Sequence, residues 1–307
     1  MSLKKLFKRQ IFEEKSISKD VQNAALDLKA KILLSINNNV FHKNIKYSEV
    51  SNASYVNGQF KYDLENFGDL KTINVKYLIY FFSDINEYNH FLYRTSDDES
   101  RNSMSDYTTK QLTIVSSIVS GTFSDSFYGE IYHELAHLYQ YSQGAQKNDT
   151  LYDKTIKLYK QGTKEDNIDK QYVALNVYYS FKTEQDAMAH QFYATLVDMQ
   201  IKEPFVNIIY RYGEYNNALK AYQYVLNNKL KCLKYIRQLG FSEKDYFKRT
   251  RQALQRFYQK SKNAYDKYCY GYKLLEESVI SETYYKKICR KWGFLLPRTI
   301  EFIYNYK

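Results

Sequence analysis

The chain has 307 residues, of which 44% are hydrophobic and 17% aromatic, and it carries a formal net charge of +11. That length and apolar content suffice to bury a sizeable core in one large or two modest domains, and they exclude a disordered chain. The three cysteines, Cys232, Cys269 and Cys289, form no paired framework and no Cys-x-x-Cys motif, so we expect reduced, buried thiols.

No membrane or secretion segment is predicted. The first ten residues are basic but lack the apolar stretch of a signal peptide. The longest apolar run, around residues 75–82, is far too short to cross a bilayer and has the composition of a buried strand. We therefore expect a cytoplasmic protein with no membrane partner.

The predicted elements begin with a helix over residues 19–37, for which Asp20 is a candidate cap. A β section follows, in which the Asn57-Gly58 pair predicts a type I′ hairpin turn between two short strands. Further strands are predicted over residues 71–82 and 110–119. The polar stretch between them, residues 95–106, has the composition of a mobile loop.

An amphipathic helix with the pattern His-Glu-x-x-His follows the strand at residues 112–119, after a turn that offers candidate N-caps at Thr122, Ser124 and Asp125. With five His and 17 Glu in the chain, the number of such matches expected by chance is on the order of 0.004. The motif therefore needs a physical explanation.

His133 and His137 lie four positions apart, so they project from one helix face, where two imidazoles can bind one cation. Glu134 is about 100° round the helix from His133, too far to complete the ligand set but near enough to contact a metal-bound water. This arrangement predicts zinc and a general base for hydrolysis. The alternative is a structural use of the two histidines, as packed core imidazoles or an inert zinc clip.

A third protein ligand is needed, and the best source is a predicted second helix over residues 182–194. Here the chain resembles the gluzincins, and most nearly the ImmA/IrrE-like peptidases of phages and mobile elements. Glu184, Asp186 and Ala187 match the order of that family's second-helix motif. The resemblance covers about residues 110–200 and implies that Glu184 is the third zinc ligand.

The second helix also departs from the family pattern. Met188 occupies the place where the family has a polar side chain that orients a ligating histidine. Asp186 is the rival ligand, although Thr183-x-x-Asp186 also predicts a capping box. The six-residue offset of His190 from Glu184 puts it on another face, as a surface or packed histidine.

Other histidines and the tyrosines give no further site residue. His42 and His90 have no metal-like spacing, and we expect them to be surface or packed residues. One of the 34 tyrosines is expected to stabilise the oxyanion, but the sequence does not select it.

Beyond about residue 150 the pattern is helical, with a helix stop at Gly240 and a capping box at Ser242 and Asp245.

Residues 204–307 hold 21 Lys and Arg against 8 Asp and Glu, a net charge of +13, whereas residues 1–203 hold 24 against 26, a net of −2. This asymmetry predicts contact with nucleic acid or an acidic protein. A solvated surface in a lysine-rich chain is the alternative.

The sequence thus predicts an α+β chain, with a zincin-like domain over residues 1–203, built on a small mixed sheet and the His-Glu-x-x-His helix, and a basic helical domain over residues 204–307. We expect zinc to be held by His133, His137 and Glu184, and Glu134 to activate water that hydrolyses a peptide or protein substrate. The competing hypothesis is a catalytically silent scaffold or phage structural protein that docks through the basic helices. The ImmA/IrrE likeness implies a host cytoplasm or a virion as its setting.

Overall fold

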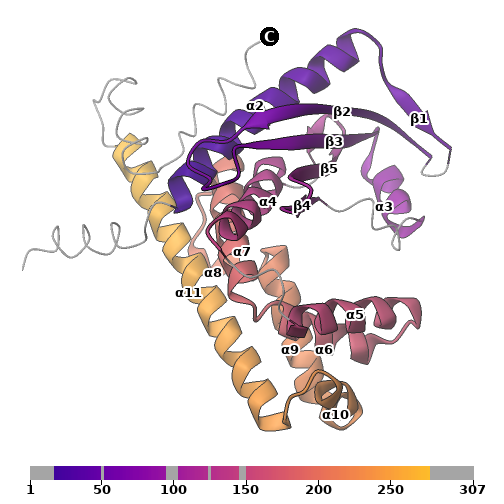
Figure 1. Ribbon diagram of the computed structural model, residues 1–307, viewed down its shortest axis with the longest axis vertical. Helices are drawn as coiled ribbons and strands as arrows, with labels where there is room; N and C mark the ends of the chain where they lie inside the picture. The colour runs from indigo at the N-terminus through magenta and orange to yellow at the C-terminus, as the bar shows by residue number, and fades with distance from the viewer. Residues whose placement is uncertain (1–16, 50–51, 95–102, 124–125, 145–149, 277–307) are drawn as a thin grey trace, which may run out of the picture. The chain divides into compact units, whose positions relative to one another are not determined.

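The computed structural model describes residues 17–49, 52–94, 103–123, 126–144 and 150–276 (Figure 1). Within these ranges the chain combines one small mixed sheet with a helical majority, which agrees with the predicted α+β class. The chain divides into two compact units. Unit 1 is Met1–Gln143 together with Lys273–Lys307, and unit 2 is Gly144–Tyr272.

The described part of unit 1 forms a six-stranded sheet in the order β1-β2-β3-β5-β4, with β6 paired to β5. β3 and β5 are parallel, and the other pairs are antiparallel. The strands are β1 (Lys46–Ser48), β2 (Ala53–Asp63), β3 (Thr72–Phe82), β4 (Met104–Asp106), β5 (Gln111–Val119) and β6 (Thr122–Phe123).

The central strand β3 shows why this sheet is covered on both faces. Ile73, Val75 and Ile79 are fully buried at alternate positions, and Tyr80 and Phe82 are buried on the opposite face. α2 (Ile17–Phe41) and α4 (Phe127–Ser142) contact each other on the first face, and the apolar cluster under α3 (Ile85–Arg94) covers the second. The sheet therefore backs α4, as the sequence predicts.

The predicted hairpin turn at Asn57-Gly58 is wrong, because β2 runs through both residues and pairs with β3 from Ser54 to Asp63. Gly58 lies opposite Tyr77, and a Cβ at Gly58 would sit 2.4 Å from the Tyr77 hydroxyl oxygen. The glycine makes room for a side chain that crosses it. That hydroxyl lies 2.6 Å from Ser35 Oγ and accepts a hydrogen bond from Asn39 Nδ2, which ties β3 to α2.

The remaining amino-terminal predictions are largely confirmed. The predicted helix is α2, although Asp20 lies inside its first turn and does not precede it. The strands predicted over residues 71–82 and 110–119 are β3 and β5. The predicted loop contains the short strand β4, and its residues 95–102 lie outside the described ranges.

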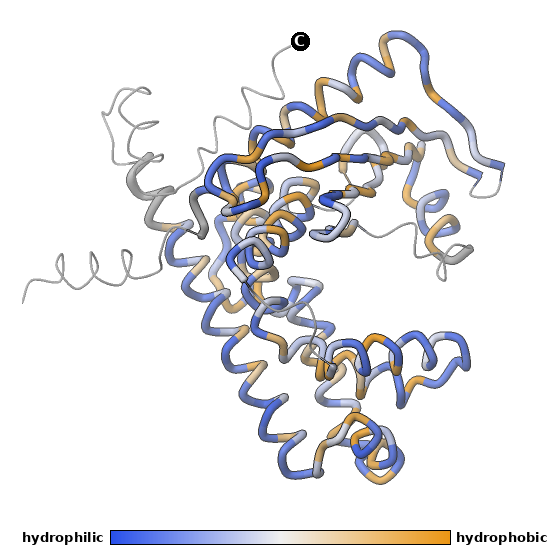
Figure 2. The backbone as a smooth tube through the Cα atoms, in the orientation of Figure 1, coloured by the Kyte–Doolittle hydropathy of each residue, from blue (hydrophilic) through white to orange (hydrophobic). Residues whose placement is uncertain are grey.

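In the described part of unit 2, all the regular secondary structure is helical. Its helices are α5 (Thr150–Lys164), α6 (Ile168–Tyr178), α7 (Lys182–Asp198), α8 (Phe205–Ile209), α9 (Gly213–Asn227), α10 (Lys229–Gln238) and most of α11 (Glu243–Glu276). The long helix α11 is largely hydrophilic with apolar residues at intervals (Figure 2). Those residues contact the shorter helices: Tyr246 donates to the carbonyl of Val173 in α6, and Phe257 meets Tyr215 of α9.

The predicted helix boundary near Gly240 is confirmed, since α10 ends at Gln238 and Gly240 adopts φ +88°. Ser242 caps α11, because its Oγ accepts from the amide of Asp245 at 3.1 Å and lies 2.6 Å from the Asp245 carboxylate. The predicted domain boundary at residues 203 and 204 falls between α7 and α8, inside unit 2. No helix in the described ranges is long and apolar enough to span a membrane.

Candidate metal centre

The helix α4 begins where the chain leaves β6. Ser126 is its N-cap, with Oγ accepting from the amide of Gly129 at 3.0 Å. Thr122, one of the predicted caps, lies in β6, and Ser124 and Asp125 fall outside the described residues. The cap thus fixes the helix start about two turns before His133.

His133 and His137 converge on that helix. Their Nε2 atoms are 3.1 Å apart, and their ring centroids are 4.8 Å apart at an interplanar angle of 75°. A tetrahedral zinc ion with Zn–N distances of about 2.0–2.1 Å holds two nitrogens roughly 3.3 Å apart, so the imidazoles fit one cation with little movement. Without a cation, the same distance accommodates an N–H···N hydrogen bond.

Gln140 orients the second histidine, because its Oε1 lies 3.2 Å from His137 Nδ1. An amide oxygen can only accept, so this contact puts the ring proton on Nδ1 and leaves Nε2 with a lone pair. His137 is buried, which limits competing solvent contacts. The neutral tautomer held here is the one that binds a metal through Nε2.

Glu134 follows His133 directly in α4 and is half-buried. Helical geometry turns it about 100° from His133. The structure thus keeps the carboxylate in the same turn as the first imidazole without bringing it onto the shared face of the histidines.

Glu184 lies in the first turn of α7, in unit 2, and only 2% of its surface is exposed. Its Oε2 accepts a hydrogen bond of 2.6 Å from the hydroxyl of Tyr178, the last residue of α6. Burial and the neighbouring Glu184 charge raise the pKa of Tyr178 well above its ordinary value, so the phenol stays protonated and donates. A buried carboxylate needs such a donor or a cation.

The start of α7 shows that the predicted capping box is wrong. Thr183 is not an N-cap, because α7 begins at Lys182 and its N-cap, Phe181, makes no side-chain cap bond. Asp186 is half-buried and forms an ion pair with Lys260 of α11, so this carboxylate already has a cation. Met188 is buried and apolar, and it supplies no polar contact to a ligand.

The other histidines behave as packed or surface residues. His190 is half-buried with Nδ1 2.5 Å from the Asp186 carbonyl oxygen, and burial, with a smaller effect of Lys267, lowers its pKa to about 4. His42 and His90 are exposed. Cys232 and Cys269 are free thiols; Cys232 is buried as expected, Cys269 is only half-buried, and Cys289 lies outside the described residues.

Two orienting residues were missed by sequence reasoning. Gln140 stands three positions after His137, one helical turn away, and this spacing is a signal that could have identified it. Tyr178 belongs to a different helix from Glu184 and is one of 34 tyrosines, so no local pattern selects it.

The chain was compared with protein-family models, with curated proteins and with solved structures, and none of these comparisons gives a match.

Proposed function

We propose that this chain is a cytoplasmic zinc-dependent endopeptidase with a zincin-like catalytic region. His133, His137 and Glu184 would hold the metal, and Glu134 would act as the general base. The observation that carries the proposal is the convergence of the two imidazoles, with Nε2 atoms 3.1 Å apart on one helix face.

The donor set supports zinc as the metal. Two imidazole nitrogens and one carboxylate oxygen are the ligands of many catalytic zinc sites, which keep a fourth position for water. The sequence supplies this donor set as His133, His137 and Glu184. Gln140 and Tyr178 provide the outer hydrogen bonds that such ligands need.

Zinc, when bound, lowers the pKa of water to about 7 and polarises a carbonyl oxygen. Glu134 takes the proton of the attacking water and returns it to the leaving amide nitrogen, so that the amine departs neutral. Gln140 keeps the proton of His137 on Nδ1 throughout, because its oxygen can only accept.

A catalytically silent scaffold is the alternative function. The net charge of +13 over residues 204–307 favours it, because a basic helical region can dock nucleic acid or an acidic protein without any chemistry. The two functions differ in whether Glu134 matters for anything besides folding.

The substitution Glu134→Gln tests the proposal. It preserves size and helix propensity but removes the base, so hydrolysis of a broad peptide library should fall by at least about 100-fold while zinc content and circular dichroism stay unchanged. The matched control is Glu130→Gln, one turn earlier on α4, where a glutamine still accepts from Ser103 Oγ. That control should hydrolyse peptides like the wild type. A wild type that cleaves no peptide, or an active Glu134→Gln variant, would refute the peptidase.

A further inference from the structure

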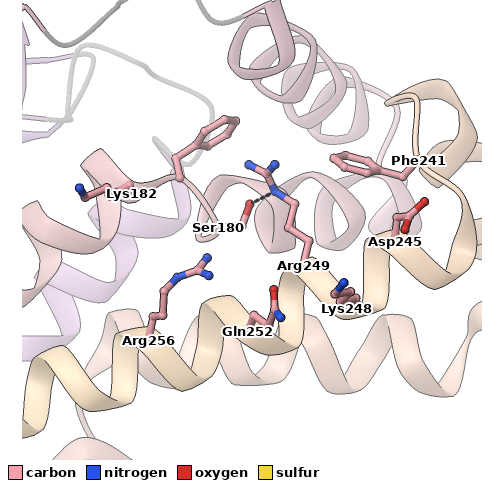
Figure 3. Close-up of a pocket in the computed structure, with 9 residues that line it drawn as sticks. Ser180, Lys182, Phe241, Asp245, Lys248, Arg249, Gln252 and Arg256 are labelled. Carbon is pink, nitrogen blue, oxygen red and sulfur yellow. Dashed lines mark hydrogen bonds between the residues drawn. The ribbon is translucent and has the colours of Figure 1, made fainter.

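Unit 2 contains an open pocket of about 560 Å³ between the start of α7 and one face of α11 (Figure 3). Four of its lining residues are cationic and one is anionic: Lys182, Lys248, Arg249 and Arg256 against Asp245. The α11 residues recur at the spacing of one helical face. None of these residues belongs to the proposed zinc chemistry.

Arg249 is held in the pocket by three contacts. Its Nε donates to Ser180 Oγ at 2.6 Å (Figure 3). The guanidinium carbon lies 5.5 Å from the ring centre of Phe181 and 5.6 Å from that of Phe241. Ser180 is itself oriented, since its hydroxyl donates to the carbonyl of Val177. The guanidinium plane is therefore fixed before any ligand arrives.

Arg256 is anchored in a similar way, by a side chain with no exposed surface. Gln185 uses its amide nitrogen to donate to the carbonyls of Tyr179 and Ala253, at 2.8 and 3.0 Å. Its oxygen is thereby directed to Arg256, whose Nε donates to it at 3.3 Å. Two guanidinium groups on one helix face are thus oriented by buried polar groups.

The electrostatics of the pocket favour an anion of more than one charge. The lining side chains sum to +3, and Asp245, the one acid among them, already accepts from Ser242. The start of α7 adds partial positive charge, and its N-cap residue Phe181 supplies no side-chain acceptor there. A single carboxylate would leave most of this charge uncompensated.

We infer that this pocket binds a phosphate-bearing ligand, in which adjacent phosphoryl groups contact Arg249, Arg256 and Lys248. Two planar guanidinium groups suit phosphate oxygens, which accept paired N–H bonds. The volume is in the range of small-molecule sites, so a free nucleotide fits, and a nucleic-acid strand presents the same chemistry. The inference does not depend on zinc or on Glu134.

Calorimetric titration of the full chain with inorganic pyrophosphate tests this site. We expect saturable binding of one ligand per chain, weakened at least about tenfold by Lys248→Gln with Arg256→Gln, because charged hydrogen bonds are lost. The matched control is Lys244→Gln with Arg251→Gln, which removes the same charge from α11 at two exposed residues that do not line the pocket. The control pair should bind like the wild type.

A conservative variant separates the pocket from diffuse charge. Arg249→Lys keeps the charge but loses the fork and the bond to Ser180, so it should also weaken pyrophosphate binding. Competition by a nucleoside triphosphate or by a short single-stranded oligonucleotide identifies the source, the stronger competitor being the natural class. Equal loss in the pocket and control pairs, or no saturable binding by the wild type, would overturn the inference. Hydrolysis in Glu134→Gln is a separate readout, so the two proposals fail independently.

Discussion

The hydroxyl of Tyr178 and Oε2 of Glu184 are joined by a hydrogen bond of 2.6 Å across the turn between α6 and α7. The donor comes from the end of one helix and the acceptor from the first turn of the next. The phenol thus fixes the position of Oε2 and, through it, the orientation of the whole carboxylate group.

Removing that hydroxyl should weaken metal binding. We expect Tyr178→Phe to lower zinc affinity by about 10- to 100-fold, the usual range for an outer-shell partner. Competition with a chromogenic chelator measures the change. Tyr179→Phe is the control, since the Tyr179 hydroxyl donates to Glu214 instead, at 3.1 Å. Equal affinities in the two variants would show that Tyr178 does not orient a ligand.

The ligand set predicts how zinc content responds to truncation. His133→Ala and Glu184→Ala should each lose most of the roughly one zinc per chain, because each removes a ligand from a three-ligand site. Asp186→Asn should retain it, since that carboxylate pairs with Lys260. Elemental analysis of purified protein gives the stoichiometry. Zinc retained in Glu184→Ala but lost in Asp186→Asn would make Asp186 the ligand.

His190 should make stability depend on pH. Its folded pKa is about 4, against about 6.5 for an ordinary histidine, so the unfolded chain binds more protons between these values. The free energy of unfolding should therefore fall as pH drops from about 6.5 to about 4, and this part of the loss should vanish in His190→Gln. Urea titrations across that range, with exposed His90→Gln as the control, measure it. Parallel profiles for wild type and His190→Gln would contradict the burial of a neutral imidazole.

A side chain at position 58 should destabilise unit 1. In Gly58→Ala the new Cβ meets the ring of Tyr77, whose hydroxyl is held by Ser35 and Asn39, so we expect a cost of about 1–3 kcal/mol. Chemical denaturation gives the change in the free energy of unfolding. Gly213→Ala is the control, because no atom other than its chain neighbours and its own helix backbone lies within 4 Å of the added Cβ. Equal stability of both variants would mean that Tyr77 moves freely.

Much of unit 1 could be predicted because its signals are local. The apolar, β-branched runs of β3 and β5 and the histidine motif of α4 each fix an element by their own periodicity. The Asn57-Gly58 pair misled because neither residue adopts the positive φ that a type I′ turn needs, and the decisive contact comes from Tyr77 on the next strand. A turn motif is read from adjacent residues, so it contains no information about a side chain on another strand.

In the candidate site, too, local patterns could be predicted and contacts between distant residues could not. The roles of His133, His137 and Glu134 could be predicted from their spacing in one helix, and the same spacing could have identified Gln140. The environment of Glu184 could not be predicted in this way, because Tyr178 approaches it from another helix. The ion pair of Asp186 with Lys260 joins residues 74 positions apart, and it replaced the capping role that the local pattern indicated.

The packing of α2 on α4 constrains how the chain reaches its native state. Val21, Leu28 and Ile32 of α2 are fully buried, yet their partner helix lies beyond residues 42–126, and the parallel strands β3 and β5 are also distant in sequence. Such long-range pairings close slowly. During synthesis, the apolar side of α2 therefore stays exposed until α4 has left the ribosome. A nascent chain that stalls before Ser142 should be prone to aggregate. The histidine pair lies on this same late helix, so it is made only when α2 gains its partner.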